Sequence, residues 1–417
     1  MTINKCLLQI VENRLNDCLM LWKATKTNYF NPNLFRINLN SLIESLRSVT
    51  WILQNQKSEL INFEEWYKKW QDQMRSDQIL IWLKDSRNVI VKEGDLKTNS
   101  KIRVSFIESW NDSSSMEFEV SPFTKTEDIA SEIARQRPDK IKLNVGLLRV
   151  ERRWVDSKLP NYELSEATAH CFNFLHELLL DAHKNLLSNE ISSYCIWYKH
   201  FKNFKGRTAP CMIAQDWDRT IWMDLEDNQI LKPKESNMPK LKKEEVIKHY
   251  PKLDSYKNKK ISKKKERNLK EEAKFFFEHA KYILSIDGYH VPTAILFYPN
   301  RNANIFELQM QNRAEKHLIY RKLAADIEKS GANGIIVIAE SWVLMLDKDK
   351  KSIHPNNRQE ALVLTAANSN GEVYTHRAIF TKDKNGKITF GKESTDFSIE
   401  SLGFLTPIVN VLKKQKS

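Results

Sequence analysis

The chain has 417 residues, 41% of them hydrophobic, and carries a formal net charge of +13 at pH 7. This apolar content, with 11 Trp and 19 Phe, excludes a mostly disordered chain, and the length suffices for two or three domains with their own cores. With only 10 Gly and 12 Pro, collagen-like, linker-rich and turn-dense all-β architectures are excluded as well.

The sequence lacks the patterns of a secreted or membrane protein. Its five Cys are scattered and form no CxxC pair, which argues against a disulfide framework. The first 22 residues interleave charged and apolar positions, as an amphipathic helix does and a signal peptide does not. Apolar runs fall far short of a membrane span. We therefore expect a reduced, cytoplasmic protein with no membrane partner.

Helical periodicity dominates the first two hundred residues. Apolar side chains recur every three or four positions over 8–22, 34–53, 63–74 and 161–187, and Asn31-Pro32 and Ser76-Asp77 offer helix starts. Alternating apolar residues on both sides of Asn111–Ser115 predict a β-hairpin near 101–121. We predict a mainly α-helical bundle domain over 1–200 with this hairpin inserted.

The second half of the chain has a different character. Over 201–231 a short strand pair is expected, Cys211–Ala214 and Thr220–Leu225. A basic linker and the start of a helix at Lys263 follow over 232–274, and an α+β domain with a largely antiparallel sheet over 275–417. Asn370-Gly371 and Asn385-Gly386 lie between alternating segments and predict two hairpins. The expected fold class is therefore multidomain, a helical bundle followed by an α+β domain.

Most of the positive charge lies in one segment. Residues 232–274 contain 16 Lys or Arg and 7 Asp or Glu, a net +9, which leaves +4 for the rest of the chain. The candidate nucleic-acid-binding residues there are Lys257, Lys259, Lys260, Lys263, Lys264, Lys265 and Arg267. They could follow a phosphate backbone, or they could form a solvated linker, and the sequence leaves both interpretations open.

Residues 77–96 carry the most informative pattern. Arg87-Asn88 follows the lead-in Trp82-Leu83-Lys84-Asp85 and two long amphipathic segments. This stretch resembles the HEPN superfamily of helical bundles, common in prokaryotic defence and toxin–antitoxin systems, whose signature is Arg, usually followed by Asn, with a His a few residues on. The resemblance covers the first hundred residues. It implies an RNA-binding or RNA-cleaving protein that dimerises through its helical domain, with no cofactor.

The resemblance also implies which residues would act. Arg87 would hold the scissile phosphate, beside Asn88, while Lys92 stands where the family often has the proton-transferring His. A lysine with a pKa of about 10.4 is charged at pH 7 and is a poor base. Two hypotheses follow: a metal-independent ribonuclease, or a non-catalytic dimerisation and interaction protein. In the second, Arg87 could instead be a buried ion-pair partner of Asp85, Asp95 or Glu44, and Asn88 could cap a helix.

A third hypothesis concerns the C-terminal domain. Asp287, Glu307 and Gln309 follow a spacing similar to that of PD-(D/E)xK nucleases, in which paired carboxylates bind Mg²⁺. Elsewhere we predict no metal site, because His176 and His183 are seven residues apart and lack the i, i+4 spacing of a helical zinc pair. The sequence contains no phosphate-binding glycine loop and no nucleophile elbow.

Overall fold

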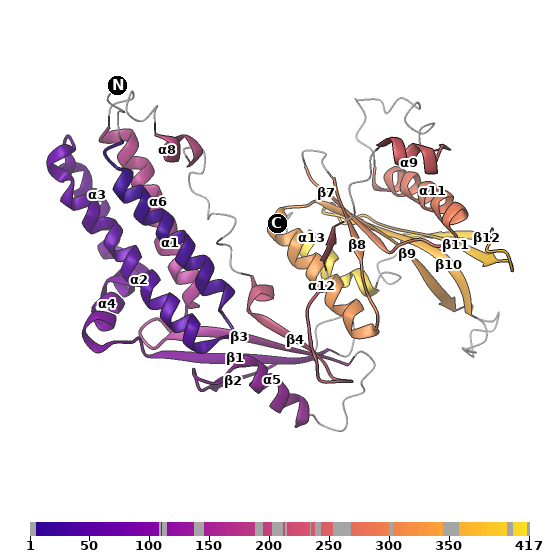
Figure 1. Ribbon diagram of the computed structural model, residues 1–417, viewed down its shortest axis with the longest axis horizontal. Helices are drawn as coiled ribbons and strands as arrows, with labels where there is room; N and C mark the ends of the chain where they lie inside the picture. The colour runs from indigo at the N-terminus through magenta and orange to yellow at the C-terminus, as the bar shows by residue number, and fades with distance from the viewer. Residues whose placement is uncertain are drawn as a thin grey trace. The chain divides into compact units, whose positions relative to one another are not determined.

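The computed structural model describes residues 6–107, 110, 115–136, 146–187, 195–201, 212, 215–233, 235–237, 243–252, 268–299, 303–344, 358–397 and 403–414. The chain forms two compact units (Figure 1). The first comprises Met1–Phe106, Ser114–Lys142 and Leu148–Ile230; the second comprises Ile107–Ser113, Leu143–Leu147 and Leu231–Ser417. A helical N-terminal region followed by antiparallel sheets confirms the predicted fold class.

A helical bundle forms most of the first unit. Its helices are α1 (Gln9–Thr27), α2 (Pro32–Asn55), α3 (Phe63–Ser76), α4 (Gln78–Glu93), α6 (Leu164–Asn185) and α8 (Ile196–Phe201), with a 3₁₀ turn η1 (Lys57–Glu59) before α3. The helix starts are set locally: Asn31 caps α2 ahead of a proline, and Asp77 caps α4. The predicted apolar stripes meet in one core, in which α2 packs against α1, α4 and α6.

The first unit also contains a five-stranded sheet, ordered β2-β1-β3-β4-β5. Its elements are β1 (Thr98–Ile107), β2 (Ser115–Val120), β3 (Leu147–Asp156), 3₁₀ turn η3 (Asp216–Arg219), β4 (Thr220–Asp224) and β5 (Ile230–Leu231), with α5 (Thr126–Arg135) sharing a core with the sheet. The antiparallel pairing of β1 with β2 confirms the predicted hairpin. Strand β4 lies where the second strand of the pair at 201–231 was expected. Strand β3 was not predicted, because it is buried on both faces and so has no apolar–polar alternation.

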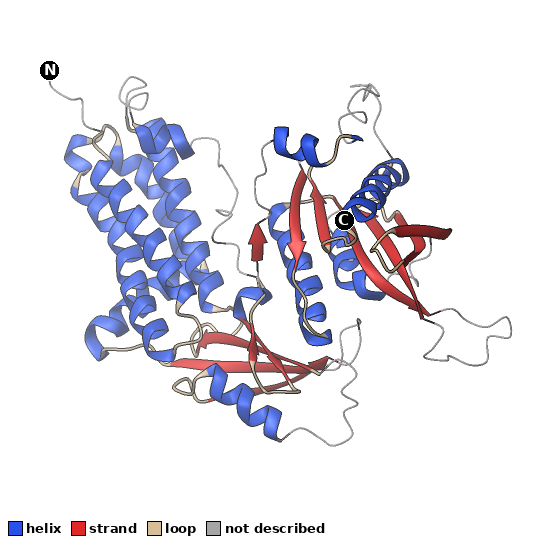
Figure 2. Cartoon of the chain, turned by 45° about the vertical axis from the view of Figure 1, so that its right-hand side comes forward, coloured by secondary structure: helices blue, strands red, loops and turns tan. Residues whose placement is uncertain are grey.

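The second unit is a sheet covered by helices on both faces (Figure 2). Its elements are β6 (Glu235–Asn237), α9 (Lys243–His249), α11 (Leu269–Asp287), β7 (Thr293–Phe297), β8 (Ala303–Leu308), α12 (Arg313–Ser330), β9 (Gly334–Leu344), β10 (Arg358–Asn368), β11 (Val373–Lys382), β12 (Ile388–Asp396) and α13 (Thr406–Lys414). The strand order is β12-β11-β10-β9-β7-β8-β6. Alternate residues of β9 face opposite cores: Ile335 packs with α12 and α13, and Ile336 packs with α11.

Both Asn-Gly steps lie in tight turns of this sheet. Gly371 joins β10 to β11 with a φ of +82°, and Gly386 joins β11 to β12 with a φ of +78°. These backbone angles are unfavourable for residues with a Cβ atom, which is why the sequence pattern located the turns. Both predicted hairpins are confirmed.

Two predicted segments fall largely outside the described residues. These are the strand expected at 211–214, of which only Met212 is described, and the basic run from Lys257 to Arg267. The helix expected to begin at Lys263 is described from Leu269, where Asn268 caps α11. Among the helices of the described ranges, none combines the length and apolarity needed to cross a bilayer.

Candidate functional site

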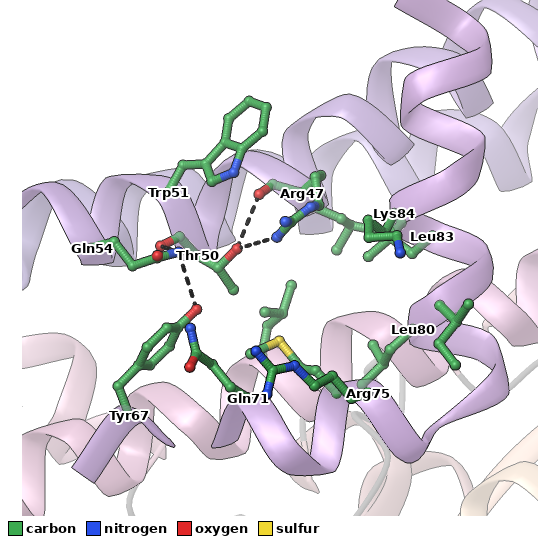
Figure 3. A pocket seen from close by; sticks show the side chains of 14 residues that line it. Arg47, Thr50, Trp51, Gln54, Tyr67, Gln71, Arg75, Leu80, Leu83 and Lys84 are labelled. Carbon is green, nitrogen blue, oxygen red and sulfur yellow. Dashed lines mark hydrogen bonds between the residues drawn. The ribbon is translucent and has the colours of Figure 1, made fainter. Parts of the chain in front are cut away.

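A pocket of about 450 Å³ opens between α2, α3 and α4 of the first unit (Figure 3). Leu46, Leu80, Leu83 and Leu175 supply apolar walls. Polar side chains enter from two sides: Arg47, Thr50 and Gln54 from α2, and Tyr67, Gln71 and Arg75 from α3. Lys84 on α4 completes the lining, so the pocket combines apolar walls with three cations.

The charged residues that line the pocket are all positive. Arg47, Arg75 and Lys84 line it, and none of its lining residues is acidic. Arg75 and Lys84 each have an exposed ion pair with a neighbour in sequence, Asp72 and Asp85, both at 3.4 Å. Such exposed pairs contribute little to stability and leave both cations available to an anion.

Arg47 is the most distinctive of the three cations. Its Nη1 donates a hydrogen bond of 2.7 Å to the Thr50 hydroxyl, and among the described residues it has no carboxylate partner. Burial lowers the pKa of Arg47 below its ordinary value, and the neighbouring charge of Arg87 lowers it further. A cation that is partly desolvated without a counter-charge is stabilised when an anion binds beside it.

Neutral hydrogen-bonding groups flank the cations. The Gln54 amide donates to the Thr50 carbonyl at 3.0 Å and to the Tyr67 hydroxyl at 3.2 Å, which fixes its orientation. Burial raises the pKa of Tyr67, so its hydroxyl stays protonated. Gln71 adds a second amide to the same wall. These groups can form hydrogen bonds with the polar edge of a planar ligand.

Trp51 connects this pocket to the residues that the sequence singled out. Its indole is 40% exposed, and the guanidinium of Arg87 lies 4.3 Å from the ring centroid, with that of Arg47 at 5.4 Å. Arg87 itself is not among the residues that line the pocket. Its Nη1 approaches the Asn88 side-chain oxygen at 3.5 Å, and the suggested partner Asp95 is bound by Arg36 instead.

Arg87, Asn88 and Lys92 all lie on α4, but they do not form one cluster. Lys92 is exposed in the last turn of the helix. Five positions along an α-helix correspond to a rotation of about 140°, so Arg87 and Lys92 point to different sides. The structure itself does not test the roles that the sequence suggested for these three side chains.

The C-terminal candidates occupy separate surroundings. Asp287 ends α11, where its carboxylate accepts hydrogen bonds from Tyr250 at 2.5 Å and His249 at 3.1 Å. Glu307 lies on β8 opposite Thr293, and Gln309 approaches its carboxylate at 3.4 Å. A magnesium site from Asp287, Glu307 and Gln309 stays a prediction.

Sequence reasoning missed Arg47 and Arg75 as site residues. On α2, Arg47, Trp51 and Gln54 share one face because they are spaced by four and three residues. That face alone looks like an ordinary solvated surface. The face becomes part of a pocket only because α3 and α4 lie next to it. No local pattern in a single sequence indicates that arrangement.

Comparison with known proteins overturns the expected family. Residues 2–417 match the model of the family described as bacteriophage lambda protein ea47. A curated relative, Protein ea47 of Escherichia phage lambda, is 26% identical over 368 residues, which cover 83% of this chain and 80% of that protein. No solved structure matches.

The HEPN assignment is therefore wrong, and so are the ribonuclease, defence and toxin–antitoxin roles that it implied. The reason is that an Arg-Asn pair on an amphipathic helix is a short pattern, which unrelated helical bundles can share. The match instead spans both units, including the sheets that the resemblance left unexplained. The chain belongs to the family of bacteriophage lambda protein ea47.

Proposed function

We propose that the protein binds a nucleotide unit, a planar base with an attached phosphate, in the pocket between α2, α3 and α4. The observation that supports this most directly is the set of three cations, Arg47, Arg75 and Lys84, in a pocket whose lining has no acidic residue. Guanidinium groups bind phosphate through paired N–H donors, and lysine binds it as a point charge.

The remaining walls suit the base. A pocket of about 450 Å³ lies within the range of small-molecule sites, and its leucine side chains offer an apolar surface. Gln54, Gln71 and the Tyr67 hydroxyl supply donors and acceptors for a base edge. At the rim, Trp51 offers an exposed indole for stacking of a neighbouring base.

We propose binding and not turnover at this site. Neither histidine nor a carboxylate lines the pocket, so its residues include no group that exchanges a proton near pH 7. The ligand could be a free nucleotide or one nucleotide of a single RNA strand, the partner that the sequence suggested. A free nucleotide and a nucleotide within RNA present the same base and phosphate to the pocket, so only binding measurements with both ligands distinguish them.

Arg47→Gln tests the proposal. Losing a charge-assisted hydrogen bond costs about 1.5–3 kcal/mol, so we expect affinity for the preferred ligand to fall roughly 10- to 100-fold. Fluorescence anisotropy with labelled mononucleotides and with short single-stranded RNA measures this and identifies the source. The matched control is Arg135→Gln, which removes one charge from α5, outside the pocket.

Equal binding by the two variants would contradict the proposal, provided that both keep the wild-type unfolding temperature. So would wild-type protein that binds neither ligand class at low salt. Lys84→Glu gives a second test, because a reversed charge should repel the phosphate from another helix of the pocket.

A further inference from the structure

Four side chains with metal-binding atoms converge in the first unit, where α1 begins and α6 ends. They are Cys6, Glu12, His183 and Cys195, and their ligand atoms all lie within 4.8 Å of one another. Cys6 precedes α1 and Glu12 lies in its first turn, His183 lies in the last turn of α6, and Cys195 directly precedes α8. Residues far apart in the sequence therefore meet at one point.

A single atom lies at the centre of this cluster. Oε1 of Glu12 is 3.2 Å from the Cys6 sulfur, 3.0 Å from the Cys195 sulfur and 2.9 Å from Nε2 of His183. Each carboxylate oxygen has about two lone-pair positions, so three hydrogen-bond donors exceed what Oε1 accepts well. A cation bound among the four groups would relieve this crowding, because the carboxylate oxygen, the imidazole nitrogen and the two sulfurs would then surround the ion and no longer share one acceptor.

We infer that Cys6, Glu12, His183 and Cys195 bind one zinc ion. Thiolates, imidazoles and carboxylates are the side-chain groups that bind zinc, and four such groups match its tetrahedral coordination. Zinc bonds of about 2.0–2.3 Å place tetrahedral ligand atoms roughly 3.3–3.8 Å apart. The separations around Glu12 and between Cys195 and His183 run from 2.9 to 4.0 Å, and no two of the four ligand atoms are more than 4.8 Å apart, so side-chain shifts without a change of fold suffice for binding.

The surroundings favour ordered ligands. The ring of His183 stacks on Tyr198, with centroids 4.9 Å apart and an interplanar angle of 23°, which fixes its direction. The backbone N–H of Tyr198 donates to the Cys195 sulfur at 3.3 Å. Such outer contacts orient metal ligands and stabilise thiolates.

The site is closed, which indicates a structural role. The His183 side chain is fully buried and that of Glu12 is 7% exposed, while Cys6 is partly exposed and offers an entry path. Four protein ligands leave no position for a substrate or an activated water. The ion would join the start of α1 to the end of α6 and the start of α8. This inference does not depend on nucleotide binding at the other pocket.

Metal analysis of the full chain, purified under reducing conditions without chelator, tests the inference. We expect one zinc ion per chain, and loss of bound zinc in Cys6→Ala and Cys195→Ala. Cys18→Ala and Cys171→Ala are the matched controls, because these buried cysteines lie outside the cluster and should leave zinc content unchanged. Cobalt exchange gives a second readout, since thiolate ligation produces a charge-transfer band that the Cys6 variant should weaken.

Several results would overturn the inference. One is zinc content in Cys6→Ala and Cys195→Ala equal to that of the controls, because the ion would then lie elsewhere. Another is a folded, reduced wild-type chain that takes up no zinc when it is added. A third is a Cys6–Cys195 disulfide, detected by mass spectrometry, in protein that never holds metal. Cys6 lies before the first helix, so its variant should still fold.

Discussion

Two arginines of the first unit, one fully buried and one half-buried, show how hydrogen-bond partners distinguish a structural cation from one that can bind a ligand. Arg152 on β3 is fully buried; it donates to Ser100 and Thr126 and to the Thr124 carbonyl, and lies 3.9 Å above Trp154. Burial lowers the pKa of Arg152 to about 10. Its donors are occupied by the protein, whereas Arg47 faces an open pocket with one hydroxyl partner. Only Arg47 therefore remains available to a ligand.

His176 should make the stability of the protein depend on pH. Burial against Trp197 and Phe201 lowers its pKa from 6.5 to about 4. The unfolded chain therefore binds a proton between about pH 6.5 and 4 that the folded chain does not, so stability falls as pH drops through this window. His176→Phe should remove up to about 3 kcal/mol of that loss.

Urea unfolding of both proteins across this pH range measures the effect. Identical pH slopes for wild type and His176→Phe would show that the imidazole is protonated equally in the folded and unfolded states. The comparison between the two proteins cancels the contributions of carboxylates, which both share.

At the scale of elements, local sequence determined the helices of the first unit better than its strands. The start of α4 is an example: Asp77 accepts hydrogen bonds from the amides of Ile79 and Leu80 at 2.8 and 3.1 Å, as its place before an apolar segment predicted. Strand β3 shows the opposite. Its pairing with β1 and β4 depends on residues distant in sequence, and its buried charges, such as Glu151, conceal its strand character.

Substitution of Asp77 tests whether this residue fixes the start of α4. Asp77→Ala should cost about 1–2 kcal/mol, because two helix amides lose their acceptor. Asp77→Asn keeps an acceptor oxygen and should retain most of the stability, even though it weakens the contact with His170 at 2.7 Å. Chemical denaturation ranks the three proteins. An asparagine variant as unstable as the alanine variant would assign the effect to His170 and not to the cap.

At the scale of the whole molecule, the two units are not consecutive pieces of sequence. The segment Ile107–Ser113 begins at the last residue of β1 but belongs to the second unit. Within the second unit, Trp110 stacks on His317 of α12 with ring centroids 3.5 Å apart, and its edge meets Tyr320 and Phe404. The fold of the second unit therefore uses a residue from the first third of the chain.

Trp110→Ala should destabilise the second unit. Loss of this partly buried ring is expected to cost on the order of 2–3 kcal/mol and to speed hydrogen exchange in α12 and α13. The control is Trp342→Ala on β9, because that ring is 64% exposed and its removal should change stability little. Equal rates of hydrogen exchange in α12 and α13 of the two variants would mean that Trp110 does not contribute to the core of the second unit.

The sequence by itself determined the long helices of the first unit, the three hairpins and the α plus α+β class, because periodicity, caps and Asn-Gly turns act within a few residues. It did not predict α9, which lies within the segment expected to be a linker. It did not determine the family, since Arg87-Asn88 is too short a pattern. Tertiary structure alone decided the two candidate sites. Arg47, Arg75 and Lys84 come from three helices, and Cys6, Glu12, His183 and Cys195 come from three more distant segments. Their chemistry depends on distances that packing sets, and no local pattern along the chain encodes those distances.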